Sequence, residues 1–260
     1  MAMYDNENTV RTSFDTDYIS EYLQQAQWAE LVELKKLIVE LAAEMGRPIS
    51  MLDIGVGNAR VPKRLSGIHE IWEMVSSYDG TDNAKACIEL AEKEITSLGI
   101  GNKTFIHFFD ATALDQWPKQ HDLVICTWFT PGNFYPDGFS FELYNQSSDK
   151  LDLSVNTKFT SIFSKAYELL HPGGEIVLGA CYIDNDSTRQ KQEDSYRKMG
   201  MTVITDEKDS FTATREGFWS QRFTKEKLFS YLPSIPPSAF RFTNLDTYEY
   251  AWQVRIKKQR

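Results

Sequence analysis

Short apolar runs alternate with helical stripes of leucine and isoleucine along this chain. Residues 51–54 and residues 123–127 form apolar runs, each of the length expected for a buried strand. From residue 30 to residue 44, leucine and isoleucine recur every three or four positions, which predicts a helix that ends at Gly46 and Pro48. Strands and helices that alternate in this way predict an α/β fold with a mostly parallel, doubly wound sheet.

The same alternation continues to the C-terminus. Residues 187–199 predict a polar helix, followed by a hairpin that pairs residues 202–204 with 210–215. Two final strands end in AWQVRIKK. The other elements that the pattern predicts are strands at 74–80, 104–109 and 175–181, and helices at 82–98, 155–170 and 223–232.

Composition limits the classes of function. The chain has 260 residues, of which 42% are hydrophobic and 25% charged, as expected for one globular domain with an elaboration. A net charge of −9 with scattered basic residues disfavours nucleic acid as a partner. No apolar run is long enough to span a membrane, and no basic segment precedes an apolar block at the N-terminus. We therefore expect no membrane partner.

The three cysteines, Cys87, Cys126 and Cys181, are widely spaced and form no C-x-x-C pair. This spacing predicts neither a disulfide framework nor a metal site, and it fits a cytoplasmic protein.

A glycine turn follows the first strand. Gly55 permits a tight turn, Gly57 lets a ligand approach the backbone beside Asn58, and Ala59 keeps the next helix close to the strand. Asp53, at the strand end, would repel the pyrophosphate of a dinucleotide but suits a cofactor with an ammonium and a sulfonium group. S-adenosylmethionine is such a cofactor. A turn that serves only packing is the alternative interpretation.

A second acidic residue strengthens this interpretation. Asp79, followed by Gly80, is expected at the end of the second strand, where its carboxylate can accept bonds from both ribose hydroxyls. His107 lies on the third strand without a recognisable catalytic partner, so we expect it to be a structural histidine.

The successive motifs resemble those of class I S-adenosylmethionine-dependent methyltransferases. They are LDIGVGNA, SSYDGTD, FFDATAL, HDLVICTW and LLHPGGEIVL, in the family's order over residues 50–180. The resemblance implies a Rossmann-like sheet of seven strands closed by an antiparallel hairpin, and it assigns the ribose to Asp79, the adenine amino group to Asp110 with Ala111 beside it, and the methionine portion to residues 55–57. Thr127 is expected at the same edge of the sheet.

Two segments outside the core are expected around the cofactor and the substrate. In the family that the chain resembles, leading helices form a lid over the cofactor, here residues 1–46, with the core over residues 47–260. Tyr18 and Tyr22 on this segment either contact the cofactor or only pack the segment on the sheet. On the other side, we expect a substrate loop at 131–156 and an insertion at 184–222.

Candidate substrate residues lie in these two segments. Asn133 belongs to a G-N-F segment with a weak resemblance to histidine Nα-methyltransferases, in which the asparagine holds the polar end of the amino acid. A simple turn residue is the alternative. Tyr135 is an aromatic candidate in the same loop, and Arg222 could bind a carboxylate with two hydrogen bonds, unless it is a solvated surface residue.

We therefore expect an S-adenosylmethionine-dependent methyltransferase that acts on a small molecule, by N- or O-methylation of an amino- or carboxylate-bearing metabolite. The protein would contribute alignment and exclusion of water, and a general base is optional. Two alternatives stay open. One is a non-catalytic scaffold with the cofactor fold, and the other is an NAD-dependent oxidoreductase, against which Asp53 and the HPGG segment argue.

Overall fold

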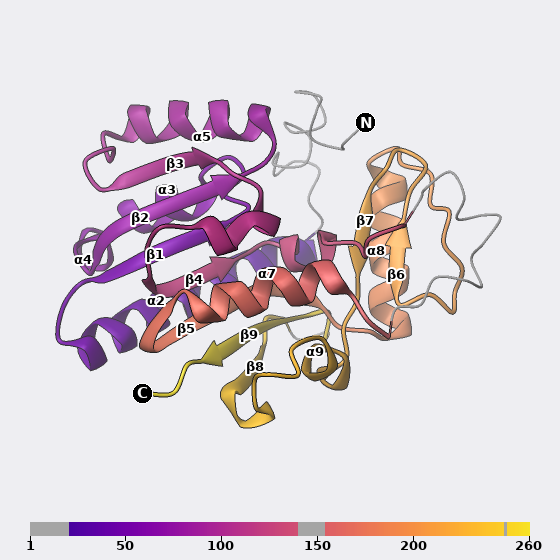
Figure 1. The fold of residues 1–260 in the computed structure, drawn as a ribbon. Coiled ribbons are helices and arrows are strands. Elements are labelled where there is room, and N and C mark those ends of the chain that lie inside the picture. The colour runs from indigo at the N-terminus through magenta and orange to yellow at the C-terminus, as the bar shows by residue number, and fades with distance from the viewer. Residues whose placement is uncertain (1–20, 140–153, 247–248) are drawn as a thin grey trace.

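A seven-stranded sheet forms the centre of the molecule (Figure 1). The structure is a computed structural model that describes residues 21–139, 154–246 and 249–260. The strand order is β3-β2-β1-β4-β5-β9-β8. The strands are β1 (Ile49–Ile54), β2 (Val75–Asp82), β3 (Thr104–Phe108), β4 (His121–Cys126), β5 (Leu170–Tyr182), β8 (Phe240–Asn244) and β9 (Ala251–Lys257).

The sheet is mostly parallel, as the sequence predicts. β1 pairs in parallel with β2 and β4, and the pairs β2–β3 and β4–β5 are also parallel. Only β9 runs antiparallel to its neighbours, β5 and β8. The chain builds outward from β1 in one direction and from β4 in the other, so the strand order reverses between these two strands. In open α/β sheets, ligands bind at the carboxyl ends of the strands at such a point.

Helices cover both faces of the sheet because alternate strand residues point to opposite sides. On one face Met51 joins a core that is completed by four helices, α2 (Glu21–Met45), α3 (Arg60–Ser66), α4 (His69–Glu73) and α5 (Lys85–Leu98). Its neighbour Leu52 joins the core of the opposite face. That face is covered by α7 (Thr157–Glu168), α9 (Lys225–Tyr231) and the 3₁₀ helices η3 (Ala111–Gln116) and η6 (Pro237–Ala239).

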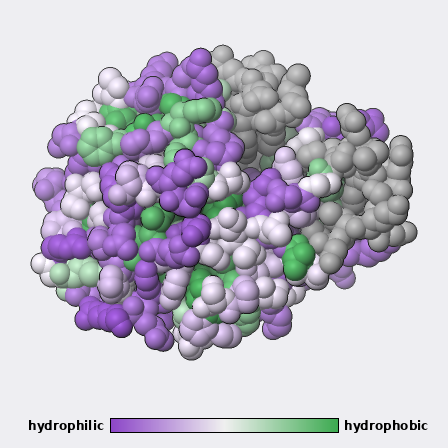
Figure 2. Space-filling model, viewed as in Figure 1, coloured by the Kyte–Doolittle hydropathy of each residue, from purple (hydrophilic) through white to green (hydrophobic). Residues whose placement is uncertain are grey.

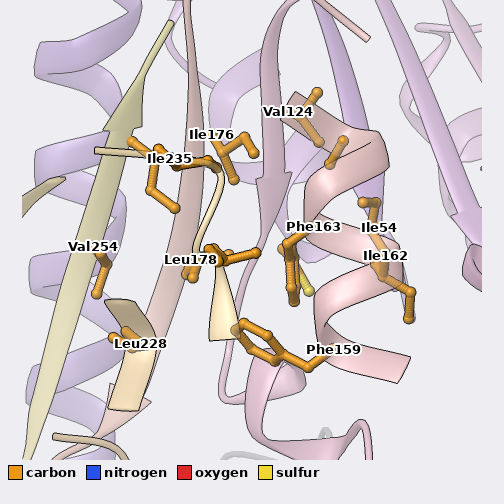
Figure 3. Close-up of a cluster of buried hydrophobic side chains, with 14 of the residues drawn as sticks. Ile54, Val124, Phe159, Ile162, Phe163, Ile176, Leu178, Leu228, Ile235 and Val254 are labelled. Atoms are coloured by element: carbon orange, nitrogen blue, oxygen red, sulfur yellow. The ribbon is translucent and has the colours of Figure 1, made fainter. Parts of the chain in front are cut away.

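Figure 3 shows how α7 packs on the second face. Phe159 lies one helical turn before Ile162 and Phe163, and all three belong to the same buried cluster as the sheet residues Ile176 and Leu178. All five side chains are buried. Outside these cores, hydrophilic residues cover much of the face seen in Figure 2, and hydrophobic residues fill smaller areas between them.

The predicted insertion forms a small layer beyond the end of the main sheet (Figure 1). It contains α8 (Asp186–Lys198) and a two-stranded sheet of β6 (Phe211–Ala213) and β7 (Trp219–Gln221). The predicted pairing of residues 202–204 with 210–215 is confirmed in part. Val203 forms an antiparallel bridge with Thr214, and the Ile204 N–H donates to the Ala213 carbonyl oxygen at 2.9 Å. The pairing of β6 with β7 was not predicted. The polar helix at 187–199 is confirmed.

Strand ends differ from the predicted bounds in two places that matter. β2 continues two residues beyond Gly80, to Asp82, because Thr81 and Asp82 still pair with β3. β5 begins at Leu170, five residues before the predicted start at residue 175, and therefore includes the HPGG segment. A Cβ at Gly174 would lie 2.6 Å from the Asp122 carbonyl oxygen, so glycine lets this part of β5 approach β4.

The described part of the predicted lid is α2, which packs on the sheet. Its buried face includes Leu31, Leu34 and Leu41 and contacts β1 and β5. Residues 1–20 lie outside the described residues, so a lid over residues 1–46 stays a prediction. None of the helices in the described ranges is long and apolar enough to cross a lipid bilayer.

Candidate functional site

A cavity of about 490 Å³ opens at the carboxyl ends of β1, β2 and β4, where the strand order reverses. One half is lined by the glycine turn, the ends of β2 and β4, and the start of η3. The other half is lined by η4 (Thr130–Asn133), the residues that follow it, α7 and the β6–β7 hairpin. Gly55, Gly57, Asn58, Asp110, Ala111, Thr127, Asn133 and Tyr135, all predicted site residues, line this one cavity.

Hydrogen bonds close the glycine turn against β2. The backbone N–H groups of Gly55 and Val56 both donate to the Thr81 carbonyl oxygen, at 2.8 and 2.9 Å. Gly55 has a φ of 80°, and a Cβ on it would lie 2.8 Å from Cγ2 of Thr130. The turn therefore requires glycine both for its backbone conformation and for its close approach to η4.

The carboxylate at the end of β2 is Asp82, not Asp79. Its Oδ2 accepts a hydrogen bond from the Gly57 N–H at 3.0 Å, and its Oδ1 accepts one from the Ala84 N–H at 2.9 Å. Burial raises the pKa of this carboxyl group against the opposing effect of those hydrogen bonds. Asp82 and the adjacent Asn83 line the cavity, and the sequence analysis missed both. A signal was present in the sequence, since Asp82 lies between the apolar start of β2 and the helix α5, which begins three residues later at Lys85.

The predicted position of Asp79 was wrong. Asp79 lies in the middle of β2, opposite Leu52, and its side chain is fully buried. It pairs with Nζ of Lys119 at 2.7 Å and with Nε2 of His107 at 3.1 Å, and it does not line the cavity. His107 therefore has the structural partner that the sequence did not reveal. The error arose because the apolar run ends at Val75, which made the strand look shorter than it is.

Gly80 also does not line the cavity. It pairs with Asp53 across β1 and β2, and a Cβ on it would lie 2.7 Å from Cγ2 of Val56. Gly80 therefore lets β2 pack closely against Val56 of the glycine turn. The prediction that Gly80 lies at the cofactor site was wrong.

Asp53 lies beneath the glycine turn. Its side chain is buried, Oδ2 accepts a hydrogen bond from the Tyr78 hydroxyl, and Oδ1 has no partner among the described residues. Burial raises the pKa of Asp53 to about 7, although the Tyr78 hydrogen bond and the nearby Arg60 oppose this effect. The carboxylate is not among the groups that line the cavity, so the predicted direct exposure to it was wrong.

A cation that the sequence analysis missed lies at the other end of the turn. Arg60, the first residue of α3, lines the cavity and donates to Oε2 of Glu30 at 2.7 Å and to Oγ1 of Thr127 at 3.3 Å. Its guanidinium lies 5.4 Å from the ring centroid of Trp128. The other carboxylate oxygen of Glu30 accepts the Trp128 N–H at 2.9 Å. Glu30 on α2 therefore connects Arg60 to the turn after β4.

The start of η3 supplies the wall opposite the glycine turn. Oδ1 of Asp110 accepts from the N–H and the hydroxyl of Thr112, at 2.9 and 2.8 Å. Burial alone would raise the pKa of Asp110, but the hydrogen bonds from Thr112 and Asn83, together with the charge of Lys158, outweigh burial and lower the pKa. Phe109 and Ala111 complete this wall with apolar surface.

Two further predicted positions were wrong. Arg222 is fully buried in the insertion, where it bonds to Gln192, Thr212 and Asp184 and to backbone oxygens of β6 and the preceding loop. A guanidinium with these partners holds the insertion together and is not free to bind a substrate. Tyr22 bonds through its hydroxyl to α8, at Lys191 and Ser195, and does not line the cavity. Tyr18 lies outside the described residues.

Aromatic side chains and one lysine form the second half of the cavity. Its walls are Asn133, Phe134, Tyr135, Lys158, Gly217, Phe218 and Trp219. Trp219 stacks on Phe211 with ring centroids 3.9 Å apart, which fixes its ring at the edge of the insertion. Within the described ranges, no three histidine, cysteine or acidic side chains are arranged to hold a metal ion.

Comparison with known proteins relates this geometry to a fold. No family model matches the chain, and no curated protein matches it. Solved structures do match. CcbJ methyltransferase from Streptomyces caelestis has a TM-score of 0.60 at 13% identity, with 99% of this chain and 98% of CcbJ covered. Magnesium protoporphyrin IX methyltransferase from Synechocystis PCC 6803, with bound SAH, has a TM-score of 0.56 at 13% identity. The match covers 98% of this chain and 100% of that enzyme.

The S-adenosylmethionine-dependent methyltransferase SibL is also similar, with a TM-score of 0.53 at 17% identity over 84% of this chain. This chain spans only 52% of SibL. The chain thus has the Rossmann-like fold of S-adenosylmethionine-dependent methyltransferases, as the motifs predicted.

Proposed function

We propose that this protein is an S-adenosylmethionine-dependent methyltransferase that acts on a small molecule. One observation supports this more than any other: the glycine turn and Asp82 share one continuous cavity with an aromatic second half. A donor bound at the turn and an acceptor bound among the aromatic residues would therefore meet inside the protein. The cavity volume of about 490 Å³ lies within the roughly 300–1,000 Å³ typical of small-molecule sites.

The residues at the turn fit S-adenosylmethionine by their chemistry. Asp82 presents a partly buried carboxylate that can accept hydrogen bonds from ribose hydroxyls. Asp110 can accept from the adenine amino group, and Phe109 offers a ring face beside it. Oδ1 of Asn58 is buried without a partner among the described residues, which leaves an acceptor for the donor's ammonium group.

Charges at the methionine end also fit. Arg60 is the cation that can pair with the carboxylate of the donor, while Glu30 offsets part of its charge. Asp53, beneath the turn, can offset the positive charge of the sulfonium and ammonium groups. A pyrophosphate at the same place would lie above two acidic side chains, so a dinucleotide fits less well.

When bound, S-adenosylmethionine supplies an electrophilic methyl group on a sulfonium. The residues of this chain align the acceptor and exclude water from it. Transfer forms a bond between an acceptor nitrogen or oxygen and the methyl carbon, while the carbon–sulfur bond breaks with its electrons left on sulfur. The acceptor's proton passes to solvent. Asn133 and Tyr135, which line the second half, are the residues that we assign to acceptor alignment.

A small acceptor suits the molecule better than nucleic acid does. The net charge of −9 opposes binding to a phosphate backbone. The two lining cations, Arg60 and Lys158, lie within the cavity and not on an extended basic face. The buried free thiols Cys87, Cys126 and Cys181 fit the reducing cytoplasm, which we propose as the location.

The cofactor assignment is tested by Asp82→Ala. Removing a carboxylate that accepts ribose hydroxyl bonds should weaken S-adenosylmethionine binding by about 1–3 kcal/mol, or roughly fivefold to 150-fold. Titration calorimetry measures this directly. The control is Asp79→Asn, which disturbs the Lys119 and His107 pairs and should lower the melting temperature but keep the cofactor affinity. Unchanged affinity in a folded Asp82→Ala protein would refute the assignment.

A further inference from the structure

The second half of the cavity has an unusual balance of charge. Its walls are aromatic on both sides, with Phe134 and Tyr135 after η4 and Phe218 and Trp219 on the hairpin. Lys158 is the cation at this end. The carboxylates that line the cavity, among the described residues, are Asp82 and Asp110, and both belong to the half with the glycine turn. The acceptor's half therefore has a lining cation and no lining carboxylate of its own, and the charge of Lys158 also helps to lower the pKa of Asp110 in the other half.

Lys158 is only loosely paired. Its Nζ lies 3.7 Å from Oδ1 of Asp137, and the Asp137 side chain is 70% exposed, so water and salt screen this ion pair. Nζ also lies 4.4 Å from the ring centroid of Tyr135. Lys158 occupies the first turn of α7, where the helix dipole disfavours a cation and favours an anion. An anionic ligand group at Nζ would improve the electrostatics of the lysine and of the helix end together.

Two polar atoms in the same walls have no partner among the described residues. They are the indole Nε1 of Trp219, whose side chain is almost completely buried, and Oδ1 of Asn133. An indole N–H can only donate a hydrogen bond, and an amide oxygen can only accept one. A buried polar group without a partner is costly, so the cavity is complementary to a ligand that supplies one acceptor and one donor.

The aromatic walls alone would also suit an ammonium ion, since rings can surround a cation. The positive charge of Lys158 disfavours an ammonium ligand at this place. Its own ammonium already lies over Tyr135, and a second cation there would be repelled. Tyr135 and Trp219 contact each other edge to face, with ring centroids 6.3 Å apart, and together form one aromatic wall. A flat ring packed against this wall, with an anionic group directed to Lys158, fits both the aromatic surface and the charge.

We propose that the methyl acceptor is an aromatic carboxylic acid with a hydroxyl or amino group, an inference that rests on the proposed methyl transfer. Its carboxylate binds Lys158 and accepts from the Trp219 indole, and its hydroxyl or amino group donates to Oδ1 of Asn133. The methyl group then bonds to that oxygen or nitrogen, the carbon–sulfur bond breaks with its electrons on sulfur, and the acceptor's proton leaves to solvent.

The test compares matched acids and amides on the protein saturated with S-adenosylhomocysteine. The probes are 4-hydroxybenzoate, 4-aminobenzoate, 4-hydroxycinnamate and indole-3-acetate, each with its carboxamide, titrated by calorimetry. At least one acid should bind tenfold or more tightly than its carboxamide. Lys158→Gln should remove this preference, and Lys158→Arg should keep it. Trp219→Phe, which keeps a ring on Phe211 but removes the indole N–H, should weaken acid binding severalfold.

The matched control is Lys165→Gln, on the same helix, where the lysine pairs with Glu168 at the surface. It should bind the acids as the unmodified protein does. The inference is overturned if no acid is preferred over its amide, or if the preference survives Lys158→Gln. Binding of S-adenosylhomocysteine, measured on the same samples, separates the two proposals. If it fails, the proposed function is wrong, and if it holds while acids are not preferred, only the acceptor class is wrong.

Discussion

Glu30 is the residue that joins three parts of the candidate site. From α2 it accepts from Arg60 at 2.7 Å and from the Trp128 N–H at 2.9 Å. Trp128 and Phe129 both have left-handed backbone conformations, with φ of 55° and 61°. Such conformations are costly for bulky residues and persist only where the surroundings hold them. Glu30 therefore positions both the cavity-lining cation and the turn after β4.

Glu30→Gln tests this role. The partly buried Arg60 would lose its charged partner, which is the buried Glu30 carboxylate, so the free energy of unfolding should fall by roughly 3 kcal/mol. S-adenosylmethionine should bind at least tenfold more weakly, because Arg60 is no longer held in place. The control is Glu33→Gln on the same helix, which removes only a surface pair with Lys36 and should change stability by less than about 0.5 kcal/mol. Denaturant unfolding and calorimetry measure the two effects, and full cofactor affinity in Glu30→Gln would contradict the positioning role.

The raised pKa of Asp53 leads us to expect that the protein releases a proton when the cofactor binds. Because burial raises its pKa to about 7, the folded protein disfavours the ionised form, and about half of the molecules hold this proton at pH 7. A sulfonium above the turn would stabilise the carboxylate, lower its pKa and expel the proton. At pH 7, the protein should therefore release more protons when it binds S-adenosylmethionine than when it binds S-adenosylhomocysteine, which lacks the sulfonium charge.

Calorimetry in buffers of different ionisation enthalpy counts these protons. The difference between the two ligands should disappear in Asp53→Asn, which cannot ionise, and also at pH 9, where Asp53 is already ionised. Equal proton release by both ligands in the unmodified protein would show that Asp53 does not sense the sulfonium.

At the scale of elements, η4 and β7 set the width of the acceptor's half. A Cβ at Gly132 would lie 2.8 Å from the Gln221 backbone oxygen, and backbone cannot move aside cheaply. Gly132 precedes Asn133 on η4, while β7 contains Trp219, so this contact fixes the spacing between the two walls.

Gly132→Ala should force η4 and β7 apart. We expect a loss of about 1–3 kcal/mol of stability from overpacking, with weakened binding of aromatic acids and unchanged binding of S-adenosylhomocysteine. Gly67→Ala is the control, because its Cβ would meet nothing closer than 3.7 Å and its φ of −68° suits alanine. If acid binding survives Gly132→Ala, the two walls do not act together.

At the scale of the whole molecule, the cavity is built from three separate regions of the chain, which are the sheet edge, α7 and the insertion. A ligand that binds only the folded state should therefore stabilise the entire protein. S-adenosylhomocysteine at a hundred times its dissociation constant contributes about 2.7 kcal/mol. For a protein of this size, that stability corresponds to a rise in melting temperature of roughly 5–10 °C.

Thermal unfolding with and without S-adenosylhomocysteine checks this rise. Asp82→Ala at the same ligand concentration should show a clearly smaller rise, because its affinity is lower. A melting temperature that does not respond to the ligand in the unmodified protein would count against the proposed cofactor.

Much of the fold follows from local sequence. The apolar runs of β1 and β4, the leucine stripe of α2 and the stop at Gly46 each depend on neighbouring residues, because strand and helix periodicity decide which side chains can be buried together. The glycine turn was predictable for the same reason, since glycine readily adopts the φ of 80° that the tight turn after β1 requires at residue 55. The motif order then predicted the sheet and its edge as the ligand site.

Tertiary structure alone decided which charged residues face the cavity. The sequence contains Asp79 and Asp82 three positions apart, and the end of β2 depends on pairing with β3, so only the folded sheet selects Asp82. Glu30 and Arg60 meet across 30 residues, and Arg222 is buried by partners from α8 and β6. Lys158 and Trp219 approach one cavity from α7 and β7. Such long-range meetings leave no local pattern, because the groups that compensate each charge are distant in the chain.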